Sequence, residues 1–429
     1  MRSDISLYKL EDCLEALIDY RGKTPSKTED GIPLVTAKVV KGGRIEEPNE
    51  FIAPGDFDAW MTRGLPSVGD VVMTTEAPLG EVGQIRQLPV ALAQRVVTLR
   101  GKAGVLHNDY LLYALQSEPV QAQLRSRSTG TTVVGIKQSE LRKVQLELPK
   151  FKEQVAIAAV LKALDDQIDL LRETNATLEA IARSIFRSWF VDFEPSAAKV
   201  EGLEALGIEP AVATMFPSAF EQSSIGRVPA GWQIGAIGDI CTNPRKQARP
   251  GDMHPDTPYI GLEHMPKKSI ALERAGKAEG LESGKFWFER NDVLFGKLRP
   301  YFHKVGLAPF QGVCSTDILV LRPIAPKWLG FMAMHASSEE LIAHTTQLSN
   351  GARMPRTSWH DVAGFKVAIP IDGIAAAFND LVTPMFGRIY ANIERARLLA
   401  GLRDTLLPRL LSGKLRLPEC QEELREMIA

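Results

Sequence analysis

The chain has 429 residues, 45% hydrophobic and 24% charged, which is enough for two or three globular domains with their own cores. It lacks the run of about 18 apolar residues that a transmembrane helix needs, and its net charge of −1 means that any polyanion must be bound by local basic patches. The N-terminus has no signal-peptide pattern, and Cys13, Cys241, Cys314 and Cys420 are too scattered for a metal site, so we expect a cytoplasmic protein with reduced thiols and no membrane association.

The first predicted domain, residues 1–150, is rich in short strands. A stretch with helical spacing of its leucines runs from Asp109 to Leu124, and Asp109 is its expected N-cap. A polar loop, residues 125–138, follows this helix. Runs of β-branched and alternating residues between turn signals predict the strands, which are Gly69–Thr74, Arg95–Arg100 and Val144–Leu148.

A heptad seam dominates the next segment, residues 151–193. Its apolar positions recur in alternating steps of four and three, so this segment predicts one long helix that buries the seam against another helix. A helix of about 38 residues would be about 57 Å long. The seam positions are Ile157, Leu161, Leu164, Ile168, Leu171, Asn175, Leu178, Ala182, Ile185 and Trp189.

An internal duplication organises the rest of the chain. Residues 194–229 form a proline-rich linker, which we expect to be ordered only by docking on its neighbours. Residues 230–371 then repeat the first domain block by block at a nearly constant offset in the numbering, and they carry 17 Lys and Arg against 13 Asp and Glu. Unrelated domains of similar composition would not keep both the order and the offset of five blocks.

A second seam occupies residues 372–414 and precedes a tail, residues 415–429. Pro384 and Gly387 interrupt its helical pattern, so we expect the helix to bend or restart near Thr383. Arg403 interrupts the apolar positions and is expected to pair with Asp165 or Asp166. The seam positions are Phe378, Val382, Met385, Ile389, Asn392, Ala396, Leu399, Arg403, Leu406 and Leu410.

Duplicated units pack most simply about a pseudo-two-fold axis, which makes the two long helices antiparallel. Asn175 and Asn392 then fall at the centre of the helix pair, where one buried amide pair would fix the register at a cost in stability. The alternative is that each asparagine faces solvent separately. The predicted fold class is therefore α+β, with two pseudo-symmetric β-rich globular domains separated by two long antiparallel helices that form a coiled coil.

Catalytic and nucleotide-binding patterns are incomplete in this sequence. Asn243-Pro244-Arg245 lacks the second proline and the aromatic residue of a methyltransferase motif. Gly22-Lys23-Thr24 lacks the earlier glycine of a phosphate-binding loop, and Met265 stands where a nuclease pattern needs lysine. The seven histidines form no HxxxH or HxH pair, so we expect no catalytic residue and no metal site in this chain.

Several stretches resemble the specificity (S) subunit of Type I restriction-modification systems over essentially the full length. The first domain departs from the family pattern at Thr74–Gly80, where Glu76 replaces basic character. The matching stretches are Gly226–Trp232, Phe295–Tyr301, Cys314–Asp317, Ser184–Phe193 and Leu402–Lys414.

This resemblance implies a non-catalytic DNA sequence-specificity subunit with two target recognition domains, each reading one half of a bipartite site in double-stranded DNA. The helices would set the spacer between the half-sites. The resemblance also implies docking of two modification (M) subunits, which carry S-adenosylmethionine and the methyl-transfer chemistry, and of restriction (R) subunits. The chain itself would hold no cofactor.

Candidate DNA contacts follow from the chemistry of the ligand, which needs Lys or Arg at phosphates and Arg, Asn, Gln, Ser or Thr at base edges. The alternative for each residue is a solvated surface charge or a structural ion pair. The polar loops Arg125–Lys137 and Leu348–Thr357 are stronger candidates as units because loops on rigid scaffolds commonly carry recognition. The candidates are Lys23, Thr24, Lys38, Arg63, Arg95, Thr131, Thr132 and Lys137 in the first domain, and Lys246, Lys297, Arg299, Lys304, Arg353 and Arg356 in the second.

A rival hypothesis is a coiled-coil scaffold whose two heads bind proteins, which the near-zero net charge favours slightly. Salt separates the two hypotheses because affinity for DNA falls steeply as salt is added.

Overall fold

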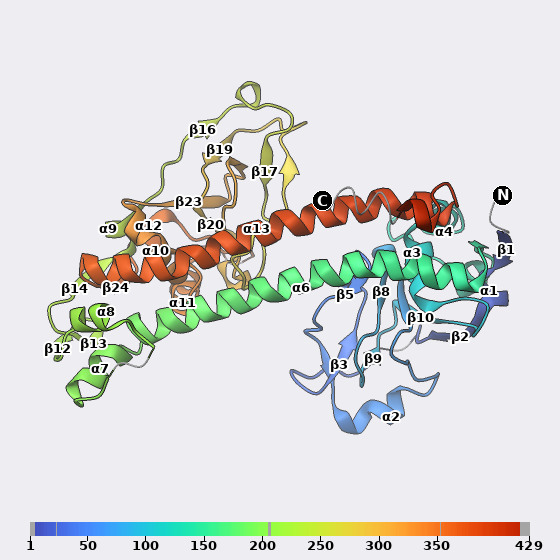
Figure 1. Ribbon diagram of the computed structural model, residues 1–429, viewed down its shortest axis with the longest axis horizontal. Coiled ribbons are helices and arrows are strands. Elements are labelled where there is room, and N and C mark those ends of the chain that lie inside the picture. The colour runs from blue at the N-terminus through green and yellow to red at the C-terminus, as the bar shows by residue number, and fades with distance from the viewer. Residues whose placement is uncertain (1–4, 23, 205–206, 352, 421–429) are drawn as a thin grey trace. The chain divides into compact units, whose positions relative to one another are not determined.

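The computed structural model describes residues 5–22, 24–204, 207–351 and 353–420. It divides into two compact units: unit 1 runs to Gln167 and resumes at Leu398, and unit 2 is Ile168–Arg397. Helices α6 (Phe151–Phe190) and α13 (Asp372–Leu411) each contribute one segment to each unit (Figure 1). Each unit therefore contains one β-rich domain and part of both long helices.

Unit 1 is built around an antiparallel sheet of strand order β2-β10-β7-β8. A sheet of order β6-β3-β9 and the pairs β1-β11 and β4-β5 complete its strands among the described residues. Its elements are β1 (Ser6–Lys9), α1 (Leu10–Cys13), β2 (Leu14–Asp19), β3 (Ile32–Val35), β4 (Val40–Lys41), β5 (Arg44–Ile45), β6 (Phe51–Ile52), η1 (Pro54–Asp56), α2 (Phe57–Trp60), β7 (Val71–Thr75), β8 (Leu79–Gln84), β9 (Ala91–Leu92), β10 (Val96–Gly101), α3 (Asn108–Gln116), α4 (Glu118–Ser126), α5 (Gln138–Leu141) and β11 (Gln145–Leu148).

The central sheet of unit 1 is buried on both faces, because successive residues of a strand point to opposite sides. Val71 and Met73 of β7 pack toward α3, α4 and the α6 segment, in a core that also contains Leu161. Val72 between them packs into a second core with Leu34 of β3. This double burial accounts for the near-continuous apolar run of β7.

Unit 2 has the same plan, with a central sheet of order β15-β23-β20-β21. Val293 and Phe295 of β20 face the helix-side core, and Leu294 faces the other core. Its elements are α7 (Glu194–Val200), α8 (Pro210–Met215), β12 (Phe220–Ser223), β13 (Gly226–Pro229), β14 (Gln233–Ala236), α9 (Ile237–Ile240), β15 (Cys241–Thr242), β16 (Gln247–Ala248), η2 (Pro250–Asp252), β17 (Pro258–Ile260), β18 (Gly276–Lys277), β19 (Lys285–Phe288), β20 (Val293–Gly296), η3 (Pro300–Phe302), β21 (Val305–Leu307), β22 (Gly312–Cys314), β23 (Ile318–Pro323), η4 (Pro326–Trp328), α10 (Leu329–Ala336), α11 (Glu339–Leu348), α12 (Trp359–Ala363) and β24 (Lys366–Ile369).

A buried ion pair recurs at the same place in both units. In unit 1, Arg100 of β10 donates two hydrogen bonds of 2.8 Å to the carboxylate of Asp70, which is 1% exposed. In unit 2, Arg322 of β23 binds Asp292 in the same way, at 2.8 and 2.6 Å. Both members of the pair recur at the same offset in the numbering, so the predicted duplication is confirmed at the level of individual contacts.

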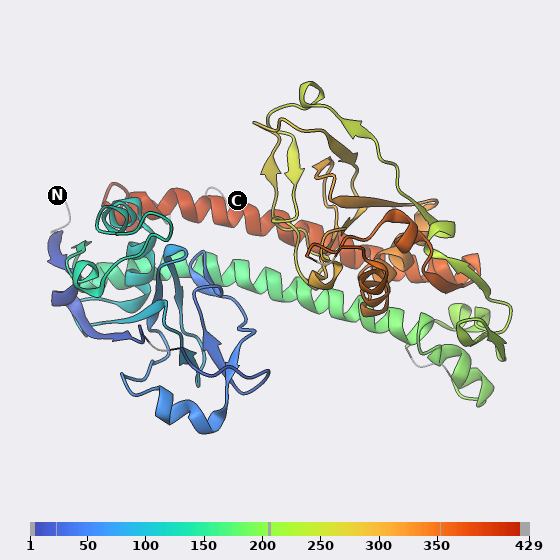
Figure 2. The same cartoon turned by 180° about the vertical axis from the view of Figure 1, so that it is seen from behind.

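The predicted helix pair is confirmed within each unit. Figures 1 and 2 show the α6 and α13 segments of unit 2 side by side, and their direction is antiparallel because Phe186 contacts Phe378 while Asn175 meets Asn392. Nδ2 of Asn392 donates to Oδ1 of Asn175 at 2.9 Å, and both residues are at most 3% exposed. The predicted asparagine pair therefore exists in the helix seam.

Arg403 also pairs as predicted. Its guanidinium lies 2.6 Å from the carboxylate of Asp165 in unit 1, and Tyr113 of α3 donates to the second oxygen of the same carboxylate at 2.7 Å. Burial, together with that neighbouring carboxylate, raises the pKa of Tyr113, so its hydroxyl remains a donor. These contacts bind the β-rich part of unit 1 to both of its helix segments.

Two predictions about helices were wrong. α13 continues through Pro384 as one helix and does not restart near Thr383. Proline has no N–H, so the carbonyl of Asp380 loses its helical hydrogen bond. Pro384 and Asp380 both lie on the exposed face, where water can bind that carbonyl. Buried Val382 and Phe386 hold this part of the helix in place. This packing outweighs the roughly 3 kcal/mol that an interior proline costs.

The predicted helix from Asp109 to Leu124 is divided into α3 and α4. The chain is extended at Ser117, and Pro119 lies in the first turn of α4, a position that suits proline because no N–H is needed there. Asp109 is not the N-cap, since that position is occupied by His107. The linker after α6 forms α7, α8 and a hairpin, and its Phe216 docks on Trp189 of α6 with ring centroids 5.2 Å apart.

Candidate nucleic-acid interface

Unit 1 carries a short hairpin loop, residues 129–135, which we call loop A. Two backbone hydrogen bonds of 2.8 and 3.0 Å join its first and last residues, and Gly130 has a φ of 115°, which favours glycine. The loop is attached to the central sheet, because the N–H of Ile136 donates to Thr75 at the end of β7 at 3.0 Å. Thr75 in turn donates to the carbonyl of Arg95 at 2.9 Å.

Unit 2 carries the equivalent loop B, residues 350–356. Its first and last residues share backbone hydrogen bonds of 3.1 and 3.0 Å, and Gly351 has a φ of 105°. The N–H of Thr357 donates to Lys297 at 3.0 Å, and Lys297 donates to the carbonyl of Asp317 at 2.8 Å. The same backbone scaffold therefore presents different side chains in the two units.

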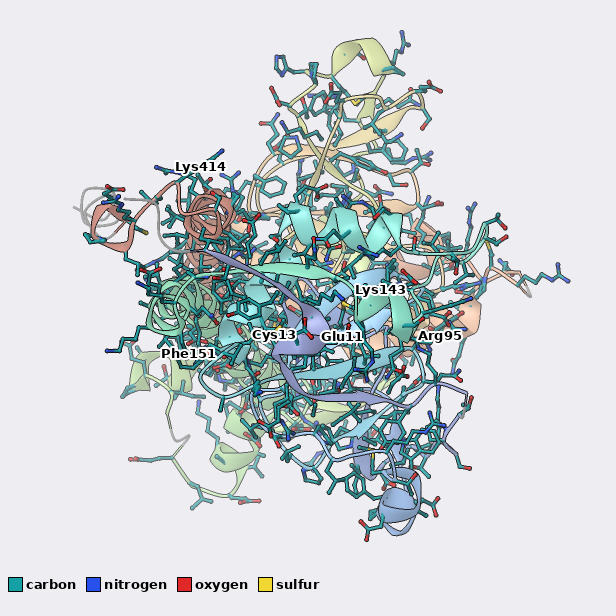
Figure 3. The ribbon with its side chains drawn as sticks, turned by 90° about the vertical axis from the view of Figure 1, so that its right-hand side faces the viewer. Glu11, Cys13, Arg95, Lys143, Phe151 and Lys414 are labelled. Carbon is teal, nitrogen blue, oxygen red and sulfur yellow. The ribbon has the colours of Figure 1, made fainter. Side chains whose placement is uncertain are left out.

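A polar cavity of about 430 Å³ lies beside loop A. Arg95, at its edge, lies on the opposite side of unit 1 from Phe151, the first residue of α6 (Figure 3). The cavity combines cationic, amide and hydroxyl groups, the types that bind phosphates and base edges. Its lining residues are Arg21, Gly22, Thr75, Glu76, Gln94, Arg95, Thr129, Val133, Gly135, Ile136 and Lys137.

Each loop lies beside one exposed ion pair. In unit 1, Nε of Arg95 is 2.9 Å from Glu76, and the two side chains are 51% and 40% exposed. In unit 2, Arg356 of loop B is 3.2 Å from Asp317, and these side chains are 59% and 31% exposed. Exposed pairs of this kind contribute only about 0–1 kcal/mol to stability, so they leave both groups available to a ligand.

Two candidate lysines of unit 2, Lys297 and Lys304, are half-buried. Burial lowers the pKa of Lys297, and this effect exceeds the opposing attraction of Asp317. Burial also lowers the pKa of Lys304, which donates a hydrogen bond to the carbonyl of Leu262. Lys304 therefore has a structural partner, whereas Lys297 lies between loop B and the start of β23.

The structure gives several other unit 1 candidates protein partners. Lys38 pairs with Glu50 at 2.9 Å, and Arg63 donates to the carbonyls of Asp19 and Arg21 at 3.1 and 2.8 Å. Lys23 lies outside the described residues. Arg95, Lys137 and the exposed loop residues Thr131 and Thr132 come together around loop A, and Thr24 donates to Gln94 at its edge at 3.3 Å.

Loop B gathers most of the unit 2 candidates. Arg299 has a left-handed backbone, its N–H donates to Pro355 at 2.8 Å, and its guanidinium donates to the carbonyl of Arg353 at 3.4 Å. Arg353 and Arg356 are exposed on the loop itself. Lys246 is exposed on the segment before β16. Whether any of these residues touches DNA stays a prediction.

Sequence reasoning missed Gln94 and Arg21, which line the cavity, and Arg245, whose charge acts on Lys297. Gln94 could have been found from the repeat, because its counterpart in the second domain, Thr316, is also a polar residue at the start of the equivalent strand segment. Arg21 precedes a loop whose path the sequence does not predict. Among the described residues, no group of three or more His, Cys, Asp or Glu side chains could hold a metal ion.

Comparisons with known proteins agree with this architecture. A family model described as the Type I restriction modification DNA specificity domain matches residues 3–180. The chain is 24% identical over 360 residues to the Type I restriction enzyme MjaIX specificity subunit of Methanocaldococcus jannaschii, covering 82% of this chain and 78% of that protein. It is 20% identical over 375 residues to the HindI specificity subunit of Haemophilus influenzae, covering 76% and 81% respectively.

A solved structure shares the fold. The S subunit of a Type I restriction-modification system from M. genitalium matches with a TM-score of 0.51 at 14% identity, over 95% of this chain and 96% of that one. No helix within the described part of the chain has the length and apolar character needed to cross a bilayer.

Proposed function

The chain belongs to the family of Type I restriction-modification specificity subunits, and we propose that each of its β-rich domains reads one half of a bipartite site in double-stranded DNA. The observation that carries the proposal is the pair of equivalent hairpin loops on one backbone scaffold, at corresponding positions of the repeat. Loops closed by the same backbone hydrogen bonds but carrying different side chains suit two readers of two different half-sites.

As a specificity subunit the chain is non-catalytic, and the methyl transfer is carried out by its partners. Two M subunits, each holding S-adenosylmethionine, dock on it, and R subunits join the complex for cleavage. Helices α6 and α13 set the spacer between the half-sites. Their length of 40 residues each and their buried register pair, Asn175–Asn392, support this role, because a fixed register gives a defined length.

The proposal is tested by reconstitution with the M subunit encoded in the same host. We expect no methyl transfer from S-adenosylmethionine to DNA by the purified chain alone. Addition of the M subunit should give methylation of one bipartite motif, identified by sequencing methylated genomic DNA. DNA affinity of the complex should fall linearly on a logarithmic scale as salt rises.

Two outcomes would contradict the proposal. One is specific binding of the complex to a single uninterrupted short site. The other is salt-independent binding of a protein partner with no DNA affinity, which the rival scaffold hypothesis predicts.

A further inference from the structure

The ion pairs beside loops A and B recur at one place in the repeat but with opposite polarity. Arg95 of unit 1 and Asp317 of unit 2 occupy equivalent positions of the duplication. Their partners lie on opposite members of an equivalent backbone bridge that joins each loop to its sheet: Glu76 is the strand-end member, bridged to Gly135, and Arg356 is the loop member, bridged to Leu298. The charge is therefore reversed at the shared position, and its partner comes from the strand end in unit 1 and from the loop in unit 2.

Resting on the proposed function, we propose that each pair, Arg95–Glu76 and Arg356–Asp317, is the reader of one G·C base pair in its half-site. In the major groove, guanine presents the O6 and N7 acceptors and cytosine presents the N4 donor. An arginine beside a carboxylate offers the complementary donors and acceptor. The pair thus matches both bases of G·C at once, and it matches A·T poorly because adenine N6 is a donor facing the guanidinium.

The environment of the unit 1 pair favours this role over a purely structural one. Glu76 and Arg95 are 40% and 51% exposed and line the polar cavity beside loop A together with Gln94 and Lys137. The backbone already holds loop A to β7 through the bond from Ile136. The side-chain pair is therefore not needed to close the loop, and its groups can turn to a base pair.

The buried pair in the same unit provides a contrast. Arg100 and Asp70 interact through two hydrogen bonds, and Asp70 is 1% exposed, so this pair has no access to a ligand. Of these two pairs, the exposed one differs in polarity between the units and the buried one does not.

The test uses the complete complex of this chain with its M subunit, and compares the methylated motif for Glu76→Gln and Asp317→Asn variants. A side-chain amide can both accept and donate, and it suits adenine. We expect Glu76→Gln to relax one G·C position in one half-site, with roughly 10- to 100-fold less discrimination, and to leave the other half-site unchanged. Asp317→Asn should do the converse.

Matched controls are Glu46→Gln and Asp256→Asn, which alter exposed pairs with Lys41 and Lys277 at 3.3 and 2.7 Å elsewhere in the same units. Both should leave the motif unchanged. A second measurement does not depend on these variants: 7-deazaguanine at the identified position removes the N7 acceptor. It should weaken DNA binding by the wild-type complex and have little further effect on an Arg95→Ala complex.

The outcomes separate this inference from the proposed function. A wild-type complex without a bipartite motif would overturn the function itself. A normal bipartite motif with unchanged base preference in both variants, or with an equal loss of methylation at every site, would overturn only the reader assignment, as would indifference of the wild-type complex to 7-deazaguanine.

Discussion

His335 shows how strongly the interior of unit 2 acts on a single side chain. Its imidazole is enclosed by aromatic rings, with centroids 4.4 Å from Phe331 and 4.7 Å from Phe186, and Nε2 has no hydrogen-bond partner within the described part of the chain. Burial lowers the pKa of His335 from 6.5 to about 3, since a charge cannot be solvated among these rings. The residue is therefore neutral in the folded protein throughout the physiological range.

This burial predicts a loss of stability in acid. Between pH 6.5 and 3 the unfolded chain binds a proton at His335 that the folded chain does not, so the free energy of unfolding falls as pH falls across that window. From pH 7.5 to 5 the expected loss is about 2 kcal/mol at 1.4 kcal/mol per pKa unit. Urea unfolding of wild type and His335→Leu at both pH values should show a smaller pH effect in the variant.

Exposed His360 provides the control for this experiment. A His360→Leu chain should keep the wild-type pH dependence. An undiminished pH effect in His335→Leu would show that the imidazole does not carry it.

Single residues were partly predictable from the sequence. Arg403 was recognisable because a charge in an apolar seam needs a partner nearby, and its pairing with Asp165 follows from the antiparallel register. The pair between Glu76 and Arg95 was not predictable. The two residues are brought together by adjacent strands, and a charge on a strand end gives no periodic signal that would identify its neighbour.

At the scale of elements, the helix seams were predictable because burial repeats every three or four residues. Nine of the ten α13 seam positions, all but Arg403, are apolar or asparagine, and both asparagines are buried as expected. The continuity of α13 through Pro384 was not predictable, because local propensity opposes it and only the packing of its neighbours decides. Pro119 indicated that the helix is divided into α3 and α4, but the helical spacing of the leucines favoured a single helix in the prediction.

The asparagine pair predicts non-additive mutations. Replacing either Asn175 or Asn392 by Leu leaves the other amide buried without its partner, which should cost about 1–3 kcal/mol. The double variant removes both amides and should be close to wild type or more stable, at the expense of a defined register. Unfolding of all four chains, followed by helical circular dichroism, gives the coupling free energy.

Additive losses in the double variant would show that the two amides do not act on each other. Asn379, whose side chain accepts a hydrogen bond from Gly330 at 3.1 Å outside the seam, offers a comparison: Asn379→Leu should not be rescued by Asn175→Leu.

At the scale of the whole molecule, the helices predict how the DNA target changes with their length. Four residues inserted into both helices at matched positions, after Gln167 and before Leu398, add about 6 Å and a net rotation of about 40°. One base pair adds about 3.4 Å and about 35°. We therefore expect the reconstituted complex to methylate a motif whose spacer is longer by one or two base pairs, with both half-sites unchanged.

The same insertion in α6 alone serves as the control, because it shifts one α6 segment against the other while α13 is unchanged, so that the seam positions of both units can no longer pair at once. That chain should lose specific methylation. An unaltered spacer after the matched insertion would argue that the helices do not set it.

Whole-molecule organisation was the level at which the sequence was most informative, since the duplication survives in strand order, ion pairs and loop closure. The cavity beside loop A was beyond its reach. The cavity depends on the path of the chain around Arg21 and on the orientation of side chains from three other segments. Neither feature produces a recognisable pattern in the sequence.

Unit 1 is assembled from two pieces of chain, and this has a consequence for synthesis. Its core includes Leu406, Leu410, Leu415 and Cys420, which are synthesised after all of unit 2, whereas unit 2 is one continuous stretch, Ile168–Arg397. Unit 2 can therefore finish folding during translation, while the first domain to be made must wait, with Leu161 and its neighbours uncovered, for the final helix turns to arrive.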